Sequence, residues 1–160
     1  MDDQAVRLDP MSQQEFEAYL AQAVPDYAAA KVATGEWAQD VSEGLSQAAF
    51  ATLLPQGLET PGHELYTVRD AASGEPVAIL YLAERPRGGR PAAYIYDIEV
   101  DAGHRGQGYG RATMNAALDR ARALGAVELN LHVFGGNATA RQLYRSLGFI
   151  ETNVQMSRPL

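Results

Sequence analysis

The chain has 160 residues, enough for one domain with a substantial hydrophobic core. Its formal net charge is −7 and it contains no cysteine, which excludes disulfides, thiolate metal sites and a cysteine nucleophile. No basic block is present, so no nucleic-acid partner is expected, and an acidic surface favours a cationic partner such as an amine.

The sequence also gives expectations about location. It has no apolar run of about 18 or more residues, so we expect no transmembrane helix and no membrane partner. The start, Met1-Asp2-Asp3-Gln4, has a net negative charge and lacks an apolar segment, so no secretory signal is expected and a cytoplasmic location is the simplest interpretation.

The first third of the chain predicts a strand and then helices. Alternation over 5–8 predicts a short strand, and Ser12-Gln13-Gln14-Glu15 forms a capping-box pattern that predicts a helix start. Pro25 and Gly35 are expected to interrupt the helical pattern beyond this start, giving a kinked or second helix. An acidic start signal at 40–43 predicts a further helix.

The middle of the chain predicts a meander of antiparallel strands and then a helix. The strand-like runs span 65–69, 76–83 and 92–100, separated by turn-forming residues. Residues 108–124 show helical spacing of apolar side chains, and Gly125 is suited to the position just after a helix end.

The last third predicts a strand over 127–134, a helix over 137–147 and a final strand over 149–156. No internal repeat or linker interrupts this order. We therefore expect a single domain over 1–160 with an α/β fold: a mixed, mostly antiparallel central sheet with helices on both faces.

The most informative segment is Val100-Asp101-Ala102-Gly103-His104-Arg105-Gly106-Gln107-Gly108-Tyr109-Gly110, which joins a predicted strand to a predicted helix. Its glycines leave the backbone bare where a helix start presents free N–H groups and the positive end of its dipole, which suits a phosphate or pyrophosphate. A triphosphate loop would need Lys-Ser/Thr after the glycines, and a dinucleotide fingerprint would need G-x-G-x-x-G; neither is present. A plain tight turn is the remaining alternative.

Arg105, Gly108 and Gly110 satisfy R-x-x-G-x-G, and with Val100 the segment resembles motif A of the GCN5-related N-acetyltransferase (GNAT) superfamily, with Ala102 where the family usually has Pro. A second segment, 131–149, resembles motif B, N-x-x-A-x-x-L-Y-x-x-x-G-F. The two motifs occur in the family's order and together cover about residues 92 to 150.

The resemblance implies acetyl-CoA as the co-substrate, held mainly by the backbone of the glycine loop and of the strand before it. No metal is expected, since the three dispersed histidines lack a metal-ligand spacing. The implied cofactor-binding residues are Ile98, Val100, Arg105, Gly106, Gln107, Gly108, Tyr109, Gly110, Arg111, Asn137 and Ala140. Asn137 also suits a helix N-cap, and both roles stay open.

The resemblance gives Tyr144 the role of protonating the departing thiolate, although Tyr144 also lies on an apolar helical face that suits a core residue. A general base must deprotonate the acceptor amine, and there are four candidates: His132, Glu99, Asp97 and Tyr96. Related bacterial enzymes that acetylate protein N-termini carry a catalytic Glu at the position of His132. Asp97 shares a strand face with Glu99, and Tyr96 is expected on the opposite face.

His132 could equally be a sheet histidine, and the carboxylates an ordinary polar face. His63 and His104 are expected in loops without a role. No G-x-S-x-G elbow suggests a covalent intermediate. We therefore expect an acetyl-CoA-dependent N-acetyltransferase acting on a primary amine of a small molecule, peptide or protein by direct attack in a ternary complex. The alternative is a non-catalytic acyl-CoA-binding module of the same fold. A homodimer is one assembly that the resemblance implies.

Overall fold

A computed structural model describes residues 5–160; residues 1–4, on which the expectation about a secretory signal rests, lie outside it. The chain divides into two compact units, residues 1–130 and residues 131–160, and each is described by itself. The prediction of a single domain over 1–160 stays a prediction.

The first unit is built on a sheet whose strands are β1 (Val6–Pro10), β2 (His63–Asp70), β3 (Pro76–Glu84) and β4 (Ala93–Val100), each antiparallel to the next. A short fifth strand, β5 (Leu129–Leu131), comes after β4 in the sheet order. The predicted mixed, mostly antiparallel sheet is confirmed.

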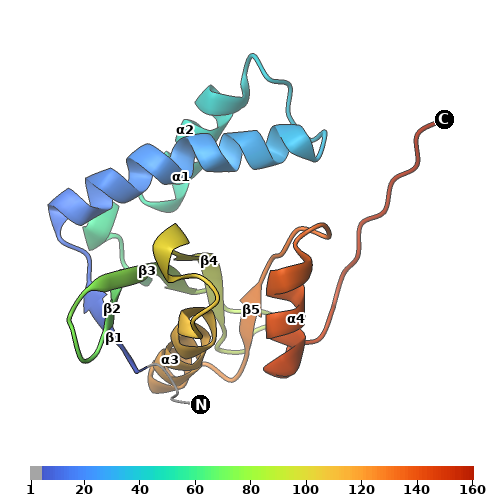
Figure 1. The fold of residues 1–160 in the computed structure, drawn as a ribbon. Helices are drawn as coiled ribbons and strands as arrows, with labels where there is room; N and C mark the ends of the chain where they lie inside the picture. The colour runs from blue at the N-terminus through green and yellow to red at the C-terminus, as the bar shows by residue number, and fades with distance from the viewer. Residues whose placement is uncertain (1–4) are drawn as a thin grey trace. The chain divides into compact units, whose positions relative to one another are not determined.

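Helices lie on both faces of this sheet (Figure 1). The α1 (Gln13–Ala33) and α2 (Ser42–Leu53) helices cover one face, and α3 (Tyr109–Ala123) covers the other, contacting β3, β1 and β4. Two single turns, η1 (Gly57–Glu59) and η2 (Ala102–His104), complete the unit.

The capping box at the start of α1 is confirmed. The Ser12 side chain accepts a hydrogen bond from the Glu15 amide at 3.1 Å, and the Glu15 carboxylate accepts one from the Ser12 amide at 2.9 Å. A second helix beginning at Pro25 is wrong, because α1 continues through Pro25 to Ala33. Pro25 and Ala21, whose carbonyl loses its intrahelical donor, are both exposed or partly exposed, so water can satisfy that carbonyl.

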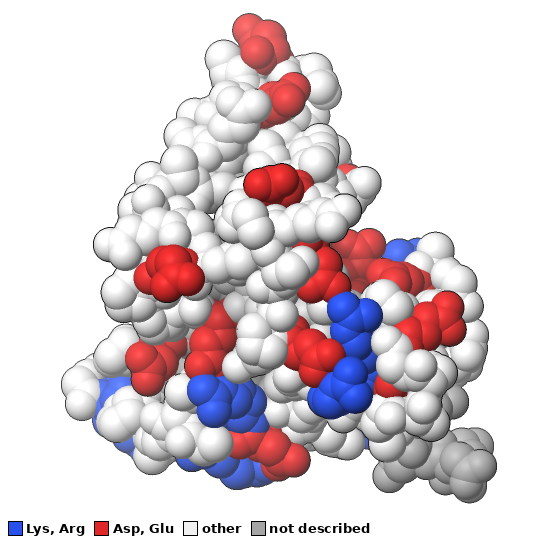
Figure 2. Space-filling view, turned by 90° about the vertical axis from the view of Figure 1, so that its left-hand side faces the viewer, with Lys and Arg blue, Asp and Glu red and all other residues white. Residues whose placement is uncertain are grey.

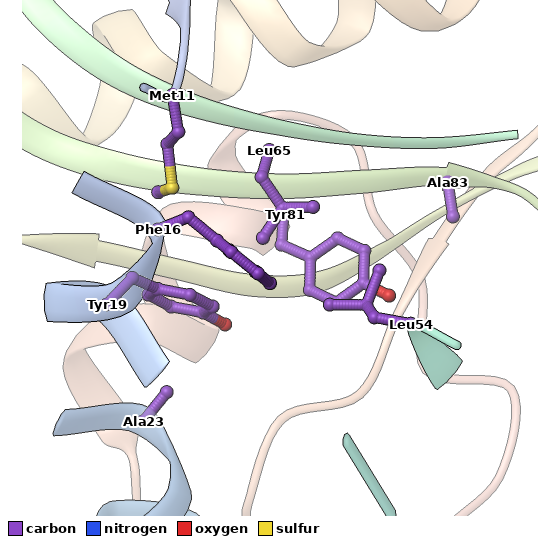
Figure 3. Close-up of a cluster of buried hydrophobic side chains, with 8 residues drawn as sticks. All are labelled: Met11, Phe16, Tyr19, Ala23, Leu54, Leu65, Tyr81 and Ala83. Atoms are coloured by element: carbon purple, nitrogen blue, oxygen red, sulfur yellow. The ribbon is translucent and has the colours of Figure 1, made fainter. Parts of the chain in front are cut away.

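The face beneath α1 carries a continuous apolar cluster, which Figure 3 shows in close-up. Phe16 and Tyr19 from α1 meet Leu65 of β2 and Tyr81 of β3 there, and all four are buried. On the opposite face, Met114 of α3 is fully buried. The sheet is therefore fixed on both sides by helices whose apolar faces the sequence predicts.

The second unit contains α4 (Ala138–Ser146) and an extended segment to Leu160. The final strand predicted over 149–156 is wrong: no strand forms there, and Ile150, Val154 and Met156 are exposed. A strand requires a neighbour that completes its ladder of hydrogen bonds, and apolar alternation cannot supply that neighbour.

Candidate functional site

The glycine loop forms a bare helix start directly after β4. The N-cap of α3 is Gly108, with a φ of +92° and no side-chain capping hydrogen bond, and Gly106 has a φ of +72°. A residue with a Cβ loses about 1–2 kcal/mol in this left-handed region, so these two glycines are required by backbone conformation. The first N–H groups of α3 are left without an intrahelical acceptor.

Side chains of three predicted site residues hold this loop in place. The Arg105 Nε donates to the Val100 carbonyl at 3.0 Å, and the Gln107 amide donates to a loop carbonyl at 3.0 Å. Tyr109 is buried, and its hydroxyl donates at 3.0 Å to Oδ2 of Asp70, the last residue of β2. These side-chain hydrogen bonds anchor the loop at the end of β4 and to the end of β2.

The donor set at this helix start fits a phosphate or pyrophosphate. Gly106, Gln107 and Gly108 are exposed, and the amides of the first α3 turn, from Tyr109 to Arg111, lie at the positive end of the helix dipole. A capping side chain would compete for these amides, and glycine at the N-cap provides none.

The two faces of β4 carry different chemistry because the strand contains a bulge. Asp97 pairs with Tyr81 and Ile95 pairs with Leu82, so Tyr96 is an extra residue on β4. Cross-strand partners share a face. Asp97 therefore lies on the α1 face with Tyr81.

Glu99 pairs with Ile79 and shares the α1 face with Asp97, as predicted, whereas Ile98 and Val100 occupy the α3 face. The expectation that Tyr96 lies on the opposite face is wrong. Its ring packs against the cluster under α1, with its centroid 4.9 Å from that of Tyr81. The bulge inserts one residue and so shifts the alternation, which the sequence pattern cannot reveal.

Asp97 is the most constrained carboxylate of this face. Its Oδ2 accepts a hydrogen bond from the Tyr19 hydroxyl at 2.9 Å. Burial raises the pKa of Asp97, and the charges of Glu99 and Asp26 raise it further, while the bonds from Tyr19 and the Ile98 amide act in the opposite direction. Burial and the Asp97 charge in turn raise the pKa of Tyr19, which therefore stays a neutral donor.

His63 lies at the start of β2, so the expectation that it sits in a loop is wrong. Its Nδ1 is 2.7 Å from the Tyr81 hydroxyl, and its ring stacks on Tyr96 with centroids 6.0 Å apart. Burial lowers the pKa of His63, so the ring is neutral near pH 7. His63 and the Tyr81 hydroxyl thus add two polar groups to the face of the sheet that α1 covers, where Asp97 also lies.

Glu99 differs from Asp97 in its surroundings. Its side chain is 52% exposed, and its Oε1 accepts a long hydrogen bond of 3.4 Å from Arg105 Nη2. The structure thus brings two predicted site residues together, Glu99 and Arg105, at the junction of β4 and the glycine loop.

In the second unit, Asn137 is the N-cap of α4, and its Oδ1 accepts from the Ala140 amide at 3.2 Å. The capping role of Asn137 is confirmed, and the cofactor contacts predicted for Asn137 and Ala140 stay predictions. Tyr144 is half-buried, with its ring centroid 5.8 Å from that of Phe149.

His132 is exposed just beyond the end of β5, so the strand expected over 127–134 is shorter than predicted and does not include it. The ladder that defines β5 stops at Leu131, and the backbone turns at Phe134, whose carbonyl accepts from the Asn137 amide at 3.0 Å.

The sequence did not indicate the polar roles of three side chains that lie between the sheet and α1: Tyr19 of α1, His63 of β2 and Tyr81 of β3. Tyr19 lies in the apolar helical pattern of α1, which signals a core residue, and nothing in that pattern indicates a partner for its hydroxyl. Only the pairing of Asp97 with Tyr81 on a face covered by α1 brings these groups together.

A mostly antiparallel sheet whose fourth strand runs into a glycine-capped helix start defines an α/β protein with a helix N-terminus suited to an anionic group. A sequence model of the Acetyltransferase (GNAT) family matches residues 29–149. The chain therefore belongs to the GNAT family, which implies acetyl transfer, generally with acetyl-CoA.

Full-length relatives support this assignment. The uncharacterized N-acetyltransferase YycN of Bacillus subtilis is 39% identical over 97% of this chain and 99% of its own. A second uncharacterized N-acetyltransferase of that organism, YdgE, is 31% identical over 98% of this chain and 99% of its own. The crystal structure of YycN, described as a putative acetyltransferase, matches with a TM-score of 0.90 at 38% identity, covering 98% of this chain and 99% of that one.

Two further observations concern residues 5–160. None of their helices is both long and apolar enough to span a bilayer. Their His, Asp and Glu side chains form no group of three or more suited to a metal ion. A cytoplasmic location and a homodimer stay predictions.

Proposed function

We propose that this chain transfers the acetyl group of acetyl-CoA to a primary amine of a small molecule, peptide or protein by direct attack in a ternary complex. The observation that carries the proposal is the uncapped start of α3, where Gly108 at φ +92° leaves backbone amides available for a pyrophosphate. The co-substrate supplies an acetyl group already activated as a thioester.

In this proposal the glycine loop and β4 have separate tasks. Backbone N–H groups from Gly106 to Arg111 bind the pyrophosphate, and Arg105 holds the loop against the end of β4. The β4 backbone near Ile98 and Val100 aligns the pantetheine arm and polarises the acetyl carbonyl. Alignment and a preorganised donor at the developing oxyanion are the main sources of rate enhancement in such a reaction.

The leaving thiolate requires a proton, and we assign it to the Tyr144 hydroxyl on the basis of the family motif. The half-buried position of Tyr144 on α4 is compatible with this role. Asn137 fixes the start of the helix that carries Tyr144. The acceptor is cationic before it reacts, and the charge of the α1 and α2 surface suits such a molecule.

Figure 2 shows Asp and Glu side chains, and no Lys or Arg, over the part of this face formed by α1 and α2. Lys31 is the one basic residue between positions 13 and 53. The acidic residues of that stretch are Glu15, Glu17, Asp26, Glu36, Asp40 and Glu43. Such a surface attracts an ammonium group and repels an anionic acceptor.

The test combines acetyl-CoA calorimetry with thiol release across a panel of primary amines. Because the chain has no cysteine, a thiol-reactive dye reports only the CoA that is released. We expect binding heat and amine-dependent thiol. Binding without turnover for every amine, unchanged in Tyr144→Phe, would indicate the non-catalytic acyl-CoA-binding module instead.

Gly108→Glu tests the placement of the loop, because it brings a side chain and a negative charge to the pyrophosphate position. Gly125→Glu is the matched control: Gly125 lies beyond the other end of α3, has a φ of +82° and has open space around it. Both variants should lose stability, and only Gly108→Glu should lose acetyl-CoA affinity. Equal affinity in the two variants would refute the proposed site.

A further inference from the structure

The carboxylate of Asp97 is held at the point where the bulge interrupts β4. One oxygen, Oδ2, accepts the Tyr19 hydroxyl at 2.9 Å. The side chain lies on the α1 face, directly across from Tyr81, and the next residue is Ile98, whose backbone belongs to the segment proposed to align the acyl group. Asp97 therefore combines a fixed position with a place next to the proposed reaction centre.

The surroundings of Asp97 favour an amine over an anion. The charged groups that act on it are Asp26 on α1 and Glu99 on β4, and both are acidic. Tyr19 and Tyr81, which face it from α1 and β3, have raised pKa values and are neutral.

Aromatic rings continue this surface beyond Asp97. Tyr94 and Tyr96 are 4.7 Å apart by ring centroids, and the Arg85 guanidinium lies 4.4 Å from the Tyr94 centroid. The aromatic rings of β4 therefore already hold one cationic group, the Arg85 guanidinium, by a cation–π contact.

The other candidates for the proton acceptor are less well placed. Glu99 is about half exposed and is bridged to Arg105. His132 is exposed at the start of the second unit, outside any strand. Burial strengthens Asp97 as a base because it raises the pKa of the carboxyl group, whereas Tyr19 keeps that group oriented.

We propose that Asp97 is the general base that deprotonates the acceptor ammonium, and that Tyr19 is its positioning residue. This inference rests on the proposed acetyltransferase function. The ammonium transfers one proton to the Asp97 carboxylate, directly or through one water, and becomes a neutral amine. The amine nitrogen then forms the C–N bond as the C–S bond breaks. The second amine proton passes to solvent, the thiolate takes its proton from the Tyr144 hydroxyl, and Tyr144 recovers a proton from solvent. The Asp97 carboxylic acid then returns its proton to solvent.

The experiment compares pH profiles of kcat/KM for wild type, Asp97→Asn and Glu99→Gln. Acetyl-CoA and three amines, 1,4-diaminobutane, 2-phenylethylamine and an alanine-terminated peptide, serve as probes. We expect Asp97→Asn to lower kcat/KM by about 100-fold near pH 7 and to bind acetyl-CoA normally, because general base catalysis contributes about that factor or more. The remaining rate should rise with pH as the free amine accumulates.

Asp119→Asn is the matched control, because it makes the same change on α3 at a side chain that is 78% exposed and bridged to Arg122. It should leave the profile unchanged. Tyr19→Phe should move the acid limb of the profile to higher pH. The hydrogen bond from Tyr19 lowers the pKa of Asp97, so its loss should raise that pKa. A purely structural role for Tyr19 would not move that limb.

Two results would overturn the assignment of Asp97 alone: an unchanged profile in Asp97→Asn, or loss of the acid limb in Glu99→Gln instead. Absence of acetyl-CoA binding or of turnover in wild type would overturn the proposed function and this inference together.

A carbon-13 titration of the aspartate carboxyls provides an independent check. One resonance should titrate above the ordinary range in wild type and be missing from Asp97→Asn, and its absence from wild type would also overturn the inference.

Discussion

Removing the Tyr19 hydroxyl should destabilise the protein in a way that depends on Asp97 and on pH. Tyr19→Phe keeps the buried ring in its cluster and therefore opens no large cavity. It deletes one hydrogen bond of 2.9 Å to a carboxylate. Hydrogen bonds to charged groups contribute about 1.5–3 kcal/mol, so we expect a loss of about that size in the free energy of unfolding at pH 7.

The pH dependence has a definite sign. Burial raises the pKa of Asp97 in the folded protein above its value in the unfolded chain. The neutral carboxyl therefore contributes stability at low pH, and this contribution is lost as the pH rises through the folded pKa. The bond from Tyr19 offsets part of this cost. At a pH below the folded pKa the carboxyl is neutral, and the penalty of Tyr19→Phe should fall to about 1 kcal/mol.

Urea unfolding of wild type, Tyr19→Phe, Asp97→Ala and the double variant at pH 7 measures the coupling between the two side chains. We expect a coupling free energy of about 1 kcal/mol or more. Penalties that add to within about 0.5 kcal/mol, or a Tyr19→Phe penalty that grows as the pH falls, would refute this reasoning.

Three further predictions concern other parts of the chain. If the Tyr144 hydroxyl acts on the leaving group, Tyr144→Phe should lower kcat more than it raises KM in steady-state kinetics. Equal activity of wild type and Tyr144→Phe would exclude that role. Ser12→Ala should reduce the free energy of unfolding by about 1 kcal/mol because it removes one half of a reciprocal cap, as a urea titration would show; Gln13→Ala provides an exposed neighbouring control. Glu64→Gln should weaken the two hydrogen bonds that Arg120 donates to residue 64. In wild type these bonds lower the pKa of Glu64, so the stability that they contribute should be lost as the pH falls through the folded pKa of Glu64. Thermal melts at pH 7 and pH 3 would then show a larger difference between the two proteins at pH 7, and an equal difference would contradict the assigned cause.

Much of the architecture depends on local rules and is therefore legible in the sequence. The cap at Ser12, the C-terminal stop at Gly125 and the cap at Asn137 depend on residues within one turn of a helix. The glycine N-cap of α3 belongs to the same category, because a left-handed φ at Gly108 is a property of one residue. These local features carry both family motifs and the expected phosphate-binding loop.

Which distant groups meet could not be determined from the sequence. The bulge at Tyr96 depends on how β4 pairs with β3, and it places Tyr96 on the α1 face. The bond between Tyr19 and Asp97 joins residues 78 positions apart, and neither side chain signals its partner locally. Continuation of α1 through Pro25 likewise depends on where its freed carbonyl faces. Periodicity and capping are set within a few residues, whereas strand register and the pairing of buried polar groups are set by packing across the whole sheet.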